Sequence, residues 1–153
     1  MRHFATTTAL VGQLARSGHE VSARVSGDSM APGMMDGDEV RLRRVEPEDV
    51  RQGDVIAYER GGRLVLHALH FTLRLGRHRW LFLKGTANPV GDRPVSWEDV
   101  VGKVTSVFRD GVESPLAPVQ ASFFAGARAW WHLVEPSPRR LLARFNFVKG
   151  VFL

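Results

Sequence analysis

Ser29 stands in the stretch "VSGDSMAPGM", directly after a Gly-Asp pair and shortly before Pro32 and Gly33. A serine hydroxyl is a weak nucleophile until a neighbouring base removes its proton. A serine held in a stiff, exposed turn just before a strand could act as such a nucleophile. If Ser29 does so, the fold must bring a base from another element beside this turn.

His67 is the strongest candidate for that base. It lies in the apolar stretch "RLVLHALHF", where alternation predicts that Val65, His67 and Leu69 share one strand face. A polar group in so apolar a strand needs a hydrogen bond or a function, and neutral imidazole suits general-base work near neutral pH. Asp92, in "NPVGDRP", could orient the imidazole as the acid of a triad does.

Four other polar residues near these candidates have simpler explanations. His70 is expected on the opposite strand face, as a half-exposed residue. Lys84 is a rival base, for which a structural ion pair is the simpler expectation. Asp38 and Asp54 each follow a glycine and precede a predicted strand, which indicates that they cap turns.

The elements that must position these residues are mostly short strands. A helix is predicted from Phe4 to Arg16, ended by Ser17 and Gly18. Alternating runs bounded by Gly-rich turns predict strands over 20–26, 38–45, 55–58, 63–75, 80–84 and 100–108. Gly102 is expected to mark a bulge in the last of these. This pattern favours a mainly β domain, a barrel or coiled sheet, over residues 20–110.

The composition of the chain changes after Gly111. A Pro-rich break, "ESPLAP", precedes a predicted helix from Val119 to Val134 and a basic, aromatic end, "RRLLARFNFVKGVFL". We therefore divide the chain into an N-terminal helical segment (1–19), a β domain (20–110) and a helical tail (111–153). Two explanations of the tail stay open: a helix packed on the sheet or on a partner chain, and an interfacial segment that contacts an anionic membrane.

Composition narrows the remaining chemistry. The chain has 153 residues, the size of one domain, with 21 Lys and Arg against 16 Asp and Glu, and no cysteine. Thiol catalysis and disulfides are therefore excluded. The histidines show no metal-ligand spacing, and we expect neither cofactor nor metal. We find no secretory signal and no apolar run of about 18 residues. We therefore expect a cytoplasmic or peripherally membrane-associated protein.

Four blocks of the sequence together resemble the signal peptidase I clan of serine peptidases, which includes the LexA-like self-cleaving repressors. "GDSMAPGMMDGDEVRL" is similar to the nucleophile box, and "RQGDVIAY" to the second box, in which a Gly-Asp turn starts a strand. "RLVLHALH" is similar to the box that carries the general base, and "LKGTANPVGDRPVSWEDVVGKV" to the late box with its acidic residue. The blocks follow the order of the family and cover roughly residues 21–108.

The resemblance implies a coiled β-sheet catalytic domain and a serine endopeptidase. His67 occupies the base position, as in the archaeal and endoplasmic-reticulum type. Ser29 would form an acyl-enzyme, Asp92 would assist His67, and the Ser29 N–H would supply part of the oxyanion hole. A peptide or leader substrate would bind by strand addition, with the strand near Val21 to Ser26 as one edge.

Two positions depart from the family pattern. Ala68 stands where Arg normally follows the base, and Thr86 stands where the late box normally has Asp. These departures keep an alternative open, a binding or regulatory protein with the peptidase fold but without efficient catalysis. A nucleic-acid-linked regulator is a third hypothesis. Nucleic acid is not an expected partner, because the first 20 residues are too short for a helix-turn-helix and the basic charge is spread along the chain.

Overall fold

Eight strands form one continuous sheet in the part of the chain that the computed structural model describes, residues 10–120 and Trp130. The strands are β1 (Val21–Arg24), β2 (Glu39–Arg43), β3 (Val55–Arg60), β4 (Arg63–Leu75), β5 (His78–Lys84), β6 (Val95–Ser96), β7 (Val100–Arg109) and β8 (Val112–Pro115). Two 3-10 turns, η1 (Pro47–Asp49) and η2 (Trp97–Asp99), precede β3 and β7. The prediction of a mainly β fold is confirmed.

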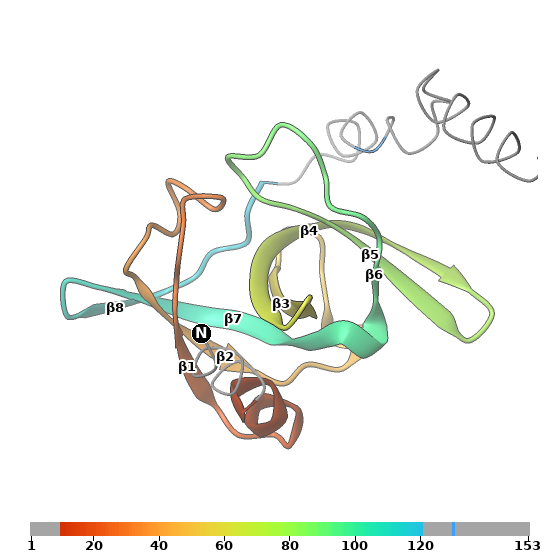
Figure 1. Cartoon of the computed structure of the whole chain (residues 1–153), viewed down its shortest axis with the longest axis horizontal. Helices are drawn as coiled ribbons and strands as arrows, with labels where there is room; N and C mark the ends of the chain where they lie inside the picture. Colours follow the sequence, from red (N-terminus) through yellow and green to blue (C-terminus); the bar gives the residue numbers. More distant parts are fainter. Residues whose placement is uncertain (1–9, 121–129, 131–153) are drawn as a thin grey trace, which may run out of the picture.

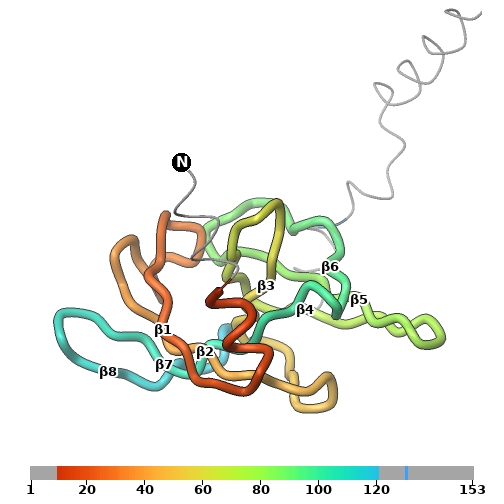
Figure 2. Tube along the Cα trace, turned by 60° about the horizontal axis from the view of Figure 1, so that its bottom comes forward, coloured from red at the N-terminus to blue at the C-terminus, as the bar shows by residue number. Residues whose placement is uncertain are grey.

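The strand order in the sheet is β1-β2-β7-β3-β4-β5-β6, with β8 paired to β7, and the pairs are antiparallel. Figure 1 shows that the sheet is strongly coiled, while Figure 2 shows from a second side that the β4–β5 hairpin extends away from the remainder. The sequence division placed residues 112–115 in the tail, but they form β8 and extend the sheet.

The sheet is buried on both faces where β3 and β4 pair. Ala57 and Ala68 belong to the larger hydrophobic core, whereas Tyr58 and Leu69 belong to a smaller, second core on the other face. Strands that are buried on both sides have near-continuous apolar sequences, as "VIAY" and "LVLHAL" do here. His67 is two residues from Leu69 in β4, so its side chain lies on the same face of the sheet as the second core. Its ring centroid is 6.3 Å from that of Tyr58.

Two bulges change the strand register close to these residues. The bulge predicted at Gly102 is confirmed, because Ala57 pairs with Gly102 while the following residue of β3 pairs with Val100. A second bulge falls at His70, since Leu69 pairs with Leu83 and Phe71 with Phe82. The expectation that His70 is half-exposed is wrong, because the bulge interrupts the alternation and His70 is buried.

A helix over residues 10–16 covers part of the larger core, into which Ala15 is fully buried. It ends where predicted: Gly18 adopts a φ of 91°, and its N–H donates to Ala15 O over 3.0 Å. Residues 4–9 of the predicted helix lie outside the described residues. So does most of the predicted helical tail. No helix among the described residues has the length and apolar character needed to cross a membrane.

Candidate active site

The segment between β1 and β2 presents Ser29 in a closed turn. Val25 N–H donates to Asp38 O over 2.7 Å, and Gly37 N–H donates back to Val25 O over 3.0 Å. These two bonds join the ends of the segment. Met30, the residue after Ser29, is only 3% exposed and packs in the larger core.

Asp38 fastens this segment to the sheet. Its Oδ2 accepts the Met35 N–H over 2.8 Å, which confirms the predicted turn cap. Arg109 on β7 also donates to both carboxylate oxygens, over 2.9 Å and 2.6 Å. The hydrogen bond from Arg109 lowers the pKa of Asp38 and outweighs the opposing effect of burial.

Asp54 repeats this arrangement before β3. Its Oδ2 accepts the Arg51 N–H over 2.8 Å, and its Oδ1 lies 2.7 Å from Lys103 Nζ of β7. Each of the two Gly-Asp turns is therefore bound to β7 through its own basic side chain. The turn chemistry was visible in the sequence, but the two basic partners were not.

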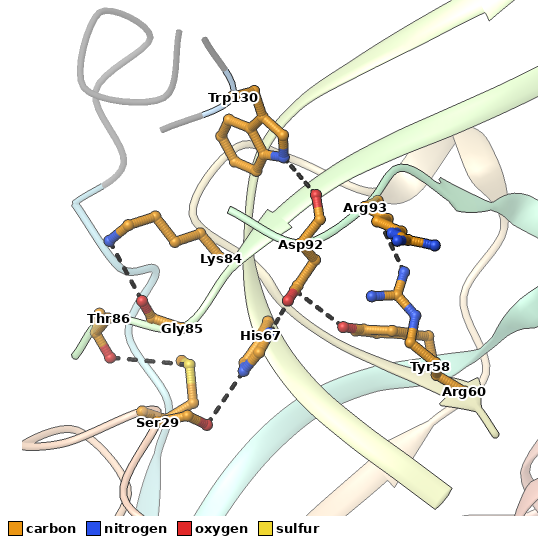
Figure 3. A network of polar contacts seen from close by, with 11 residues as sticks. Ser29, Tyr58, Arg60, His67, Lys84, Gly85, Thr86, Asp92, Arg93 and Trp130 are labelled. Atoms are coloured by element: carbon orange, nitrogen blue, oxygen red, sulfur yellow. Dashed lines mark hydrogen bonds and ion pairs between the residues drawn. The ribbon is translucent and has the colours of Figure 1, made fainter. Parts of the chain in front are cut away.

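The structure brings the three predicted site residues together (Figure 3). The His67 ring lies between the other two: its Nε2 is 3.1 Å from Ser29 Oγ, and its Nδ1 is hydrogen-bonded to Asp92 Oδ2. His67 is 6% exposed, whereas Ser29 is partly exposed and thus open to an incoming group. With an ionised Asp92, Nδ1 donates and Nε2 is left to accept the Ser29 hydroxyl proton.

Asp92 is held by three further contacts. Its N–H donates to Leu83 O over 2.9 Å, and its carbonyl accepts the Trp130 indole N–H over 2.6 Å. The Tyr58 hydroxyl donates to Asp92 Oδ2 over 2.9 Å. Burial, together with the negative charge of Asp92 and the hydrogen bond to it, raises the pKa of Tyr58. The phenol therefore remains a neutral donor.

The segment after β5 positions the nucleophile and the base together. Ala87 N–H donates to Ser29 O over 3.0 Å, which joins the two segments. Gly85 passes so close that a Cβ placed on it would lie 2.5 Å from Ser29 O and 3.0 Å from His67 Nε2. Only a residue without a side chain fits at this point.

The two departures from the family pattern lie beside the three site residues and are not hydrogen-bonded to them. Ala68 is fully buried in the larger core. Thr86 is exposed, and its Oγ1 lies 3.8 Å from Met30 Sδ.

Lys84, the rival base, contacts Gly85 O over 3.3 Å. Among the described residues Lys84 forms no ion pair, so the expectation of a structural ion pair is wrong.

Two surface hollows of about 360 and 210 Å³ lie elsewhere, around Trp97 and the arginines near it, and none of the three site residues lines either. In the described part of the chain, no three His, Asp or Glu side chains gather closely enough to hold a metal ion.

The sequence model of the family described as Peptidase S24-like matches residues 2–85, more than half of the chain. The chain belongs to this family. The resemblance to the LexA and signal peptidase-like serine peptidases is thus confirmed, and the protein has a serine peptidase fold. The S24-like match includes Ser29 and His67 but ends before Asp92. No curated protein matches the chain significantly.

Sequence reasoning missed two residues of the site. Tyr58 could have been noticed as the single tyrosine of the chain, at the end of an apolar strand. Trp130 gave no local signal, because it lies 38 residues beyond its partner Asp92.

Proposed function

We propose that the protein is a serine endopeptidase that cleaves a peptide or leader sequence, with Ser29 as nucleophile and His67 as general base. The observation that carries the proposal is the position of the His67 ring, with Nε2 3.1 Å from Ser29 Oγ and Nδ1 bonded to Asp92. The distance from Nε2 to Oγ is within the range over which a base can remove the proton of a nucleophile.

The chemistry follows from this arrangement. Ser29 Oγ bonds to the scissile carbonyl carbon while its proton moves to His67 Nε2. The tetrahedral intermediate then collapses, the C–N bond breaks, and Nε2 gives the proton to the leaving amine. A water molecule attacks the acyl-enzyme by the same proton transfers and releases the carboxylate product and free Ser29. Asp92 accepts the hydrogen bond from Nδ1–H throughout and stabilises the imidazolium.

The backbone around Ser29 supports an oxyanion-binding role for its N–H. Within the described residues, the Ser29 carbonyl is bound by Ala87, whereas the Ser29 N–H has no acceptor. This donor is thus available to the oxygen of a tetrahedral intermediate. Loss of one such donor typically costs about 10²–10³ in rate.

An extended substrate fits the edge position of β1. This strand ends the order of the sheet, and the chain runs from it directly into the Ser29 turn. A peptide added to β1 as a further strand would reach the nucleophile without entering a closed pocket. This mode of binding gains its affinity from main-chain hydrogen bonds.

The test is acylation of the purified protein by a fluorophosphonate probe, followed by intact mass and peptide mapping. We expect labelling at Ser29, its loss in Ser29→Ala, and rates reduced by at least about a hundredfold in His67→Ala, the scale of general-base catalysis. Ser26→Ala is the matched control, since Ser26 is an exposed serine three residues away.

Incubation with a mixed peptide library, read by mass spectrometry, provides a second measurement that does not depend on the probe. Cleavage that disappears in Ser29→Ala supports the proposal. Absence of both labelling and cleavage in the folded parent protein would instead favour the binding or regulatory alternative.

A further inference from the structure

Trp130 reaches the candidate site from the C-terminal part of the chain. Its indole N–H donates to Asp92 O over 2.6 Å, and the residue is 4% exposed (Figure 3). Trp130 lies far beyond residue 85, where the family match ends. The contact is therefore a feature of this chain outside the matched region.

The Trp130 indole packs closely against the backbone and against neighbouring aromatic rings. A Cβ placed on Gly91 would lie 2.1 Å from Trp130 Cε2, so the ring rests directly on the backbone beside Asp92. The edges of three aromatic rings of β4 and β5 surround it, with centroids 5.3 Å away for His70, 5.5 Å for Phe71 and 5.7 Å for Phe82. Such edge-to-face pairs are each worth about 0.5–1.5 kcal/mol beyond burial.

We propose that Trp130 is a positioning residue that holds Asp92 against His67 and thereby controls the competence of the Ser29 site. Asp92 lies in a loop between β5 and the two-residue strand β6. Its backbone is held by two bonds, one to Leu83 O and one from the indole. Without the hydrogen bond from the indole, the Asp92 backbone keeps only its bond to Leu83 O. The Asp92 carboxylate, which orients the His67 ring, is then less firmly placed.

The claim that Trp130 affects reactivity at Ser29 rests on the proposed peptidase activity. The claim that Trp130 positions Asp92 does not. Any change that broke the contact of Trp130 with Asp92 would lower reactivity at Ser29 without touching Ser29 or His67. The site would then depend on a residue that lies 15 positions beyond the last strand.

Two substitutions test the contact from opposite sides in the full chain. Trp130→Phe keeps a ring on the aromatic residues but lacks the N–H, and Gly91→Ala pushes the indole away from the backbone. Trp80→Phe is the control, because Trp80 is a partly buried tryptophan of β5 that pairs with Ser96 of β6. Thermal unfolding curves establish the temperature at which all variants are folded.

The first readout is the set of ¹H–¹⁵N correlations of the His67 ring, assigned by their loss in His67→Ala. These signals report the tautomer and the Nδ1 hydrogen bond. We expect them to shift and broaden in Trp130→Phe and Gly91→Ala, and to match the parent in Trp80→Phe. The second readout is the rate of probe labelling at Ser29, expected to fall about tenfold in both variants. The double variant should lose no more than the stronger single one, since both break one contact.

The outcomes separate the two claims. Unchanged ring signals in both folded variants would overturn the positioning role of Trp130. Shifted ring signals in a parent protein that the probe never labels would uphold that role and count against the peptidase activity. If the ring signals shift while labelling keeps the parent rate, the contact does not control competence, and the proposal fails.

Discussion

Tyr58 and His67 bind the same oxygen of one carboxylate. The Tyr58 hydroxyl lies 2.9 Å from Asp92 Oδ2, which is also the partner of His67 Nδ1. The phenol comes from β3 and the imidazole from β4, and the two strands are paired, so the sheet itself sets the spacing of the two donors. Tyr58 is fully buried, which leaves its hydroxyl few alternatives to this bond.

Tyr58→Phe should weaken both the fold and the site. A hydrogen bond to a charged group contributes about 1.5–3 kcal/mol, and we expect the free energy of unfolding in urea to fall by that amount. Probe labelling should fall about tenfold, equivalent to about 1.4 kcal/mol of lost orientation. In an Asp92→Asn background the same change should have a smaller effect on both quantities. Equal effects in the two backgrounds would show that Tyr58 acts independently of Asp92.

Alkaline pH should destabilise the protein through Tyr58. Its pKa is raised on folding, so above about pH 10 the unfolded chain loses the phenolic proton while the folded protein keeps it. The folded state then binds more protons, and the free energy of unfolding falls as the pH rises. The phenolate absorbance of the folded protein reports this group alone, because Tyr58 is the only tyrosine. Ionisation near pH 10 without unfolding would contradict the prediction.

Acid should remove the contribution of the Asp38–Arg109 pair. The pKa of Asp38 is lowered on folding, so its stabilisation is complete above the unfolded value of about 3.9 and is lost as the pH falls through the lower, folded value. Arg109→Ala should therefore lower Tm near neutral pH, and the gap to the parent should close in acid. Arg43→Ala, an exposed arginine of β2 without an ion pair in the described residues, is the control. A gap that is independent of pH would exclude this linkage.

Gly85→Ala should separate the nucleophile from the base. The new methyl group would meet Ser29 O at 2.5 Å and His67 Nε2 at 3.0 Å, and displacements of about 1 Å can cost a hundredfold in rate. We expect that loss in probe labelling while the protein remains folded. Gly12→Ala is the matched control: its nearest neighbours would be 3.6 Å away, and in a helix it should be neutral or stabilising. Parent-like labelling of Gly85→Ala would show that the site relaxes easily.

Restoring the two family residues should have opposite results. Ala68→Arg would place a charge in a fully buried position, and an unpaired buried charge costs about 3–5 kcal/mol, so urea unfolding should show a large loss or no folded protein. Thr86→Asp is exposed and should change the free energy of unfolding by no more than about 0.5 kcal/mol. A stable Ala68→Arg variant would mean that this region of the core can open to admit a longer side chain.

Local patterns sufficed to predict much of the fold and the central pair of the candidate site. Strand alternation predicted β4 with its observed bounds, and the Gly-Asp pairs predicted the turns that Asp38 and Asp54 cap. The motif around Ser29 and the isolated imidazole of His67 pointed to the two residues that the sheet places 3.1 Å apart. Periodicity and turn chemistry are short-range properties, which is why they could be read along the chain.

The contacts around Asp92 depend on packing between distant segments. Tyr58 and Trp130 are separated from Asp92 by 34 and 38 residues, and no local pattern links them to it. The burial of His70 depends on a bulge, which one extra residue in the pairing of β4 with β5 creates. Register shifts and close approaches such as that of Trp130 to Gly91 arise from how strands and segments fit together in three dimensions. They became visible when the folded arrangement of the chain was known.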